Sequence, residues 1–202
     1  MLETPSDLLQ LKRLICPLAI SLLGLSISLS PESLPELLQY HRTAVAKGEW
    51  WRLFTAHLTH LGWGHLLMNL IGLWLIWHLF LSHRRSYWCT YTLPLLMIGT
   101  SAGLWFFTPE VTWYQGLSGA LHGLLIWALL WQLQTERMLS TILMLCVVSK
   151  LAWEQWLGPL PGSESMASGR VIVDAHLYGA VCGGILWSIE QIGSAIRHGD
   201  TG

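Results

Sequence analysis

The chain has 202 residues, of which 52% are hydrophobic and only 11% are charged, and its mean hydropathy is +0.47. Soluble domains usually carry about 25% charged residues, so this composition argues against a soluble domain and places the chain in the membrane class. The net charge is −1, and no basic stripe indicates nucleic acid as a partner. The lipid bilayer is therefore the expected environment.

Six apolar segments approach the length of about 20 residues that a helix needs to cross a bilayer. They are residues 14–30, 64–82, 88–107, 117–133, 138–157 and 171–192, with an outer loop over 31–63. We predict an all-α membrane protein with six transmembrane helices, forming one domain over residues 1–202. The first segment has an alternative interpretation as a cleaved signal peptide, with Lys12 and Arg13 as its basic region.

The distribution of Lys and Arg predicts the orientation of these helices. With the N-terminus in the cytoplasm, the inside segments hold Lys12, Arg13, Arg84, Arg85, Arg137 and Arg197, and the outside segments hold Arg42, Lys47, Arg52 and Arg170. This modest bias favours a cytoplasmic N-terminus. The segments 64–82, 117–133 and 171–192 then begin at the outer face, and their polar residues lie at a similar depth.

Ser118 stands in a Gly-x-Ser-Gly motif, between Gly116 and Gly119, where the fourth segment begins. Glycine allows a tight turn and close backbone approach, and the first N–H groups of a helix are free to bind a developing oxyanion. Serine is also an ordinary residue at a helix start, so this motif alone is weak.

His176 opens a His-x-x-Gly-x-x-x-Gly motif with Gly179 and Gly183. Small residues four apart allow helices to approach closely in lipid, so we expect His176 to lie against a neighbouring helix, that of Ser118. An ionisable residue within a span usually has a function. The alternative is a packing motif with an incidental histidine. Asp174 lies on a different side of the helix and receives no catalytic role.

His65 and Asn69 are four residues apart on one face of the second segment, and both side chains can donate hydrogen bonds. They could complete an oxyanion hole with the backbone N–H of Ser118, or they could hydrogen-bond one helix to another. A neutral histidine such as His176 would supply the base that a nucleophilic serine needs.

Taken together, these motifs resemble the rhomboid family of intramembrane serine proteases over residues 49–184. Trp51-Arg52 is similar to the Trp-Arg pair of the family's first loop. The resemblance implies a six-helix rhomboid-like bundle without a cofactor. It also implies that Ser118 and His176 form a catalytic dyad and that His65, Asn69 and Ser118 form an oxyanion hole. The supporting positions that it implies are Gly116, Gly119, His122, Gly179, Gly183, Trp51 and Arg52.

More narrowly, the stretches HLTHLGWGHLLMNLIGLW, GLSGALHG and DAHLYGA are similar to the rhombosortase subfamily. This implies a bacterial inner-membrane enzyme with its active site open to the periplasm. Its partners would be membrane-anchored substrates with a C-terminal transmembrane segment, cleaved at Gly-Gly sorting tails. The alternatives are a rhomboid protease of other transmembrane substrates, a non-catalytic binder of membrane helices, and a small transporter.

One position departs from the family pattern. Many rhomboids have a tyrosine four residues after the nucleophile, where it stacks on the catalytic histidine, and this chain has His122. His122 shares a helix face with Ser118 and is expected to point toward His176. It would act as a substitute packing partner or change the acid–base behaviour of the dyad.

Lys150 and Glu154 lie four apart in the fifth segment, where a charge should face protein or water and be paired. They are predicted to form an internal ion pair, with Glu154 as a possible substrate contact. The turn-rich stretch 158–165 follows as an external loop.

Two other sets of residues are of types that can form disulfides or bind metals. Cys16, Cys89, Cys146 and Cys182 stand alone in apolar runs and are predicted to be small buried hydrophobes rather than disulfide or metal ligands. His57, His60 and His65 have a spacing that zinc could use, yet no carboxylate or cysteine lies near them in sequence. The sequence therefore predicts no metal site.

Overall fold

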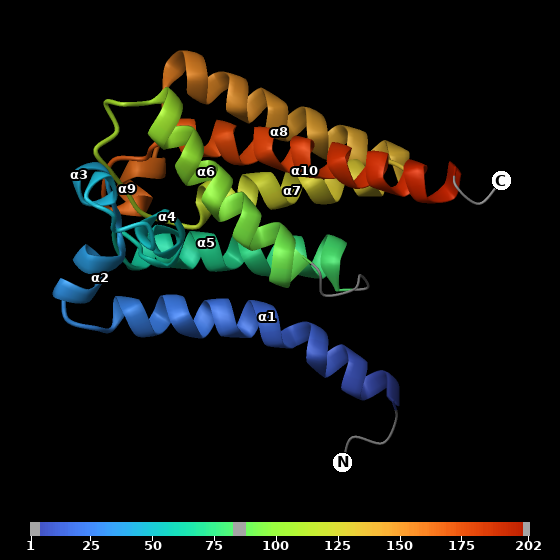
Figure 1. Ribbon diagram of the computed structural model, residues 1–202, viewed down its shortest axis with the longest axis horizontal. Coiled ribbons are helices and arrows are strands. Elements are labelled where there is room, and N and C mark those ends of the chain that lie inside the picture. Colours follow the sequence, from blue (N-terminus) through green and yellow to red (C-terminus); the bar gives the residue numbers. More distant parts are fainter. Residues whose placement is uncertain (1–4, 83–87, 200–202) are drawn as a thin grey trace.

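The computed structural model describes residues 5–82 and 88–199, most of which form helices lying side by side (Figure 1). Arg84 and Arg85, which contribute to the orientation prediction, lie outside these residues. The long helices, with the helical turns that continue them, are α1 (Pro5–Ser28), α5 (Trp63–Ile76) with η2 (Trp77–Leu81), η3 (Trp88–Thr92) with α6 (Leu93–Phe107), α7 (Ser118–Gln132), α8 (Arg137–Leu157) and α10 (Val173–Gly199).

These helices occupy all six apolar segments, and the main differences are at the two ends of the chain. Helix α1 begins at Pro5 rather than at residue 14, and α10 continues to Gly199 rather than ending at 192. A helix satisfies its backbone groups internally, so it can extend through polar residues beyond the apolar stretch. Among the described residues, Trp63–Leu81 and Arg137–Leu157 are long and apolar enough to cross a membrane. The count of six crossings stays a prediction.

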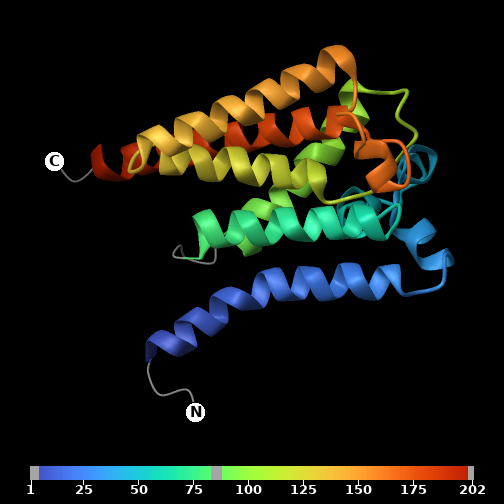
Figure 2. The same cartoon turned by 180° about the vertical axis from the view of Figure 1, so that it is seen from behind.

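Short elements cap one end of the bundle, the end at which α5, α7 and α10 begin (Figures 1 and 2). They are α2 (Ser33–Leu38), β1 (Tyr40–His41), α3 (Arg42–Ala46), α4 (Arg52–Thr55), η1 (Ala56–Leu58), β2 (Trp113–Tyr114) and α9 (Ser163–Ala167). Strands β1 and β2 pair antiparallel, with Tyr40 opposite Tyr114. This pairing joins the outer loop to the segment that leads into α7.

Two arginines hold the outer loop in place. The buried Arg52 donates from Nη1 to the carbonyl oxygens of Glu36 and Gln39, at 2.7 and 2.8 Å, and from Nε to Glu49 at 2.7 Å. Arg42 donates to backbone oxygens at the end of α6, including that of Leu104 at 2.7 Å. Arg52 is thus bonded within the outer loop, and Trp51 beside it is exposed.

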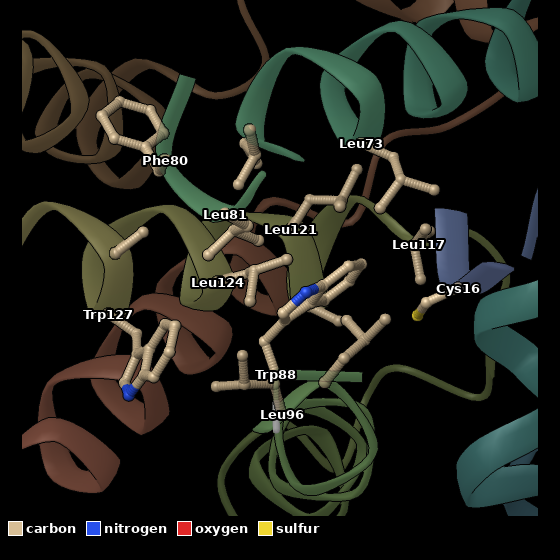
Figure 3. Packing of buried hydrophobic residues seen from close by; sticks show 14 of the residues in the cluster. Cys16, Leu73, Phe80, Leu81, Trp88, Leu96, Leu117, Leu121, Leu124 and Trp127 are labelled. Carbon is tan, nitrogen blue, oxygen red and sulfur yellow. The ribbon is translucent and has the colours of Figure 1, made fainter. Parts of the chain in front are cut away.

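Helix α7 lies in the middle of the apolar core. Its buried leucines include Leu117, just before the helix, and Leu121 and Leu124 within it. Figure 3 shows these side chains around the indole of Trp88, with Leu96 of α6 on the other side. A helix surrounded in this way is held in a defined position, and Ser118 is its first residue.

The contact between α7 and α10 depends on facing glycines. A methyl group added at Gly179 of α10 would overlap the carbonyl oxygen of Gly119, and one at Gly183 would overlap that of Gly123. The two backbones therefore touch, as small residues in membrane helices allow. This close approach brings the first turn of α10 against the first turn of α7.

The structure corrects the cysteine prediction. Cys16 of α1 and Cys89 of η3 form a disulfide across 73 residues, and Cys146 is exposed rather than buried. Spacing along the sequence could not reveal the pair because it depends on how α1 packs against the bundle. Cys182 is free and half-buried.

We expect Gly183→Ala to destabilise the bundle, because its methyl group would force α7 and α10 apart. Overpacking of this kind costs about 1–3 kcal/mol. The matched control is Gly184→Ala, since nothing lies within 4 Å of a methyl group there and alanine favours a helix by about 1 kcal/mol. Thermal unfolding in detergent micelles should show a lower Tm for the first variant only. Equal Tm values would contradict the close contact.

We expect peptide mapping under non-reducing conditions to recover Cys16 linked to Cys89. Cys16→Ser should lower the free energy of unfolding by about 2–4 kcal/mol, because the bond closes a long loop in the unfolded chain. Cys146→Ser is the control and should leave stability unchanged. Recovery of all four cysteines as free thiols would refute the disulfide.

Candidate active site

The hydroxyl of Ser118 and the imidazole of His176 meet where α7 and α10 begin. Ser118 is the first residue of α7, and His176 lies in the first turn of α10. Nε2 of His176 is 3.0 Å from Oγ of Ser118, and the histidine is 6% exposed. This distance lies within the range for proton transfer between a nucleophile and its base.

The other ring nitrogen of His176 contacts Glu154 of α8. Nδ1 lies 2.9 Å from Oε2 of Glu154, which is 3% exposed. A carboxylate can only accept, so the proton of the neutral ring lies on Nδ1. The lone pair of Nε2 then faces Ser118, as a base requires. The sequence did not indicate this bond, because Glu154 and His176 belong to different helices.

Lys150 lies one turn before Glu154 on α8 and forms the predicted ion pair. Its Nζ is 2.7 Å from Oε2 of Glu154 and 2.9 Å from Nε2 of His122. The same ammonium lies 3.3 Å from Nδ1 of His176. Lys150, Glu154, His122 and His176 thus form one connected polar cluster below Ser118.

The ring of His122 stacks on that of His176, with centroids 4.3 Å apart and planes 21° apart. Nδ1 of His122 lies 2.7 Å from the backbone oxygen of Ser118, so that nitrogen carries the proton and donates. Nε2 then accepts from the ammonium of Lys150. His122 therefore points toward His176 and stacks on it, as its place four residues after Ser118 predicts.

A tight turn at Gly116 lies just before Ser118 and the start of α7. Gly116 has a φ of +116°, a conformation that favours glycine, and a methyl group there would lie 2.5 Å from Cε1 of His65. The hydroxyl of Tyr114 donates to the carbonyl of Gly116 at 2.7 Å and accepts from the N–H of Gly119 at 3.4 Å. Burial raises the pKa of Tyr114, so its hydroxyl stays protonated. Tyr114 is a supporting residue that the sequence motifs did not indicate.

His65 and Asn69 line the same cavity as Ser118 and His176. Nδ1 of His65 accepts from the backbone N–H of Leu61 at 3.4 Å, which leaves the proton on Nε2, beside Gly116. Asn69 donates one amide hydrogen to the carbonyl of His65 at 3.0 Å, and the amide has a second hydrogen. Both side chains are suited to donate to an anion beside Ser118.

A cavity of about 450 Å³ extends from this polar site between α5 and α8. Its walls are mostly apolar, and residues of α9 and the adjoining loops lie at one end. The residues from α5, η2 and α8 that line it away from Ser118 are Gly72, Leu75, Ile76, Leu79, Phe80, Leu143, Cys146 and Val147. An extended apolar peptide segment could reach Ser118 through this space.

Of the three histidines considered for zinc, His57 and His65 form hydrogen bonds, and His60 packs edge-on against the ring of His65. Nε2 of His57 lies 3.1 Å from the hydroxyl of Ser101, and burial lowers the pKa of His57 to about 4, which keeps it neutral. Within residues 5–82 and 88–199, the group with ligand atoms close enough for a metal is instead His122, Glu154 and His176. The ammonium of Lys150 contacts all three and takes the position of a cation there.

Comparison with known proteins agrees with this architecture. The structure is a helical bundle that brings the hydroxyl of Ser118 and the imidazole of His176 together at one end. The family model of the rhomboid domain matches residues 47–190, and the chain belongs to the rhomboid family, whose members are membrane-embedded serine proteases. No curated protein matches the chain.

We expect Tyr114→Phe to slow the reaction of Ser118 with a fluorophosphonate probe. The substitution deletes one hydroxyl and removes its hydrogen bonds to the carbonyl of Gly116 and to the N–H of Gly119, at about 1–3 kcal/mol per buried group. Tyr91→Phe is the control, because that residue is 66% exposed. Equal labelling rates for both variants would show that Tyr114 does not support the Ser118 turn.

Proposed function

We propose that the chain is an intramembrane serine endopeptidase in which Ser118 is the nucleophile and His176 is the base. The observation that carries this proposal is the contact of 3.0 Å between Oγ and Nε2 at the starts of two packed helices. Membership of a family of intramembrane serine proteases supports the same reaction.

The reaction would proceed by acyl transfer. Oγ of Ser118 attacks the peptide carbonyl carbon while its proton moves to Nε2 of His176. The backbone N–H of Ser118, Nε2–H of His65 and an amide hydrogen of Asn69 bind the oxyanion. When the intermediate collapses, His176 gives its proton to the leaving amine. A water molecule, deprotonated by His176, then hydrolyses the acyl-enzyme.

The cavity supports a membrane-anchored substrate. Its apolar walls between α5 and α8 suit a transmembrane segment, and His176 and Ser118 lie at its polar end. A helical segment hides its carbonyls in internal hydrogen bonds, so it must unwind before cleavage. Glycine lowers helix stability by about 1 kcal/mol per residue and leaves room in a narrow site.

These requirements support the finer proposal of rhombosortase-type processing. The substrate would carry a Gly-Gly motif followed by a C-terminal transmembrane helix. The enzyme would lie in a bacterial inner membrane with a cytoplasmic N-terminus and a site open to the periplasm. The gathering of the short capping elements and the starts of α5, α7 and α10 at one end supports a site near one membrane surface (Figure 2).

We expect Ser118→Ala and His176→Ala each to abolish cleavage in proteoliposomes, with Ser149→Ala, an exposed serine of α8, as the control. His65→Ala and Asn69→Ala should each slow cleavage by roughly 10²–10³, because each removes an oxyanion donor.

Two reporters, one with a Gly-Gly tail and one with an unrelated transmembrane helix, should differ in turnover in favour of the first.

Full activity of Ser118→Ala would refute the protease proposal. Equal turnover of the two reporters would remove the rhombosortase assignment and leave a rhomboid protease of other transmembrane substrates. A purified protein that binds both reporters, cleaves neither and resists the fluorophosphonate probe would be a non-catalytic binder.

A further inference from the structure

We propose that Glu154 is a positioning residue, held by Lys150, that keeps the proton of His176 on Nδ1. Nε2 of His176 is then free to accept the proton of Ser118. The inference rests on the proposed function, because it adds a third member to the Ser118–His176 pair. It replaces the idea that Glu154 contacts the substrate.

The placement of Glu154 favours an internal role. Its carboxylate is 3% exposed, and Oε2 already accepts from Nδ1 of His176 at 2.9 Å and from Nζ of Lys150 at 2.7 Å. An intramembrane carboxylate is costly unless it is paired, and both of its contacts are with side chains of this chain. Glu154 is in the last turn of α8, so a third helix contributes to the site.

The protons of the cluster can be assigned without conflict. The ammonium of Lys150 can only donate, and it donates to Glu154 and to Nε2 of His122. His122 then carries its proton on Nδ1 and donates to the carbonyl of Ser118 at 2.7 Å. His176 donates from Nδ1 to Glu154 and accepts from the hydroxyl of Ser118. In this arrangement His176 is the base.

The arrangement depends on the carboxylate because a competing donor lies close by. Nζ of Lys150 is 3.3 Å from Nδ1 of His176. Without a carboxylate to accept the proton of Nδ1, the ammonium would donate to that nitrogen. The proton of the ring would then move to Nε2 and face Ser118, and His176 could no longer accept a proton there.

The carboxylate also acts when His176 becomes charged. Proton transfer from Ser118 produces an imidazolium next to the ammonium of Lys150, in surroundings of low dielectric. Glu154 lies between the two cations and contacts both, so it offsets their repulsion. The neutral ring of His122 stacks on the face of the His176 ring.

The first test is Glu154→Gln, which keeps the size of the side chain and removes its charge. We expect kcat to fall by about 10²–10⁴ with KM unchanged, as when the carboxylate behind a catalytic histidine becomes an amide. The matched control is Glu190→Gln. Glu190 of α10 also accepts two hydrogen bonds, from Nε1 of Trp127 and of Trp131 at 3.0 Å each, and we expect full kcat.

The second test is Lys150→Met in the Glu154→Gln background. This double variant removes the competing donor and leaves no unpaired charge, so it should fold and recover part of the kcat that the single variant loses. A purely structural role for the ion pair predicts a different result, with kcat of the double variant at or below that of Glu154→Gln. Tm values recorded alongside would identify any loss due to unfolding.

The outcomes separate the two proposals. If Ser118→Ala abolishes cleavage and Glu154→Gln keeps full kcat, the positioning role is refuted and the protease proposal stands. A change of KM alone in Glu154→Gln would make Glu154 a substrate contact and also refute the inference. Activity in Ser118→Ala would refute the proposed function itself.

Discussion

The contact between the backbones of α7 and α10 is the constraint on which the site depends. Gly119 and Gly123 on α7 face Gly179 and Gly183 on α10, where even a methyl group would meet a carbonyl oxygen. Apolar side chains gain little from leaving lipid for one another, so close packing must hold such helices together. With the helices this close, the first turn of α10 places an imidazole 3.0 Å from a hydroxyl of α7.

The polar cluster beneath Ser118 is a second constraint, and it connects α8 to the other two helices. Charges inside an apolar bundle are tolerated when each donor meets an acceptor. Here the ammonium of Lys150 is paired with Glu154 and His122, and His176 completes the set. The same bonds that make the charges tolerable also assign the tautomer of each histidine, so stability and chemistry have one physical origin.

Ser118 is placed by elements outside the bundle as well. The pairing of β1 with β2 fixes the position of Tyr114. Its hydroxyl forms hydrogen bonds with the carbonyl of Gly116 and the N–H of Gly119, on either side of Ser118. Arg52 and Arg42 hold the outer loop that carries β1. The site thus combines an apolar cavity between α5 and α8 with a polar end at Ser118 and His176.

The residues that act within one helix or one turn could be predicted from the sequence. Ser118 at a helix start, the pair His65 and Asn69, and the glycines around His176 are local patterns, and the helical period places each on a definite face. All six apolar segments are helical for the same reason.

Only the tertiary structure decided which helices meet. Lys150 and Glu154 satisfy each other locally at four residues' spacing, so nothing in the sequence required Glu154 to reach His176, 22 residues away on α10. Cys16 and Cys89 likewise look like isolated apolar residues until α1 packs against η3. A sequence displays periodicity within an element, whereas the partner of a buried charge or thiol depends on how separate elements pack.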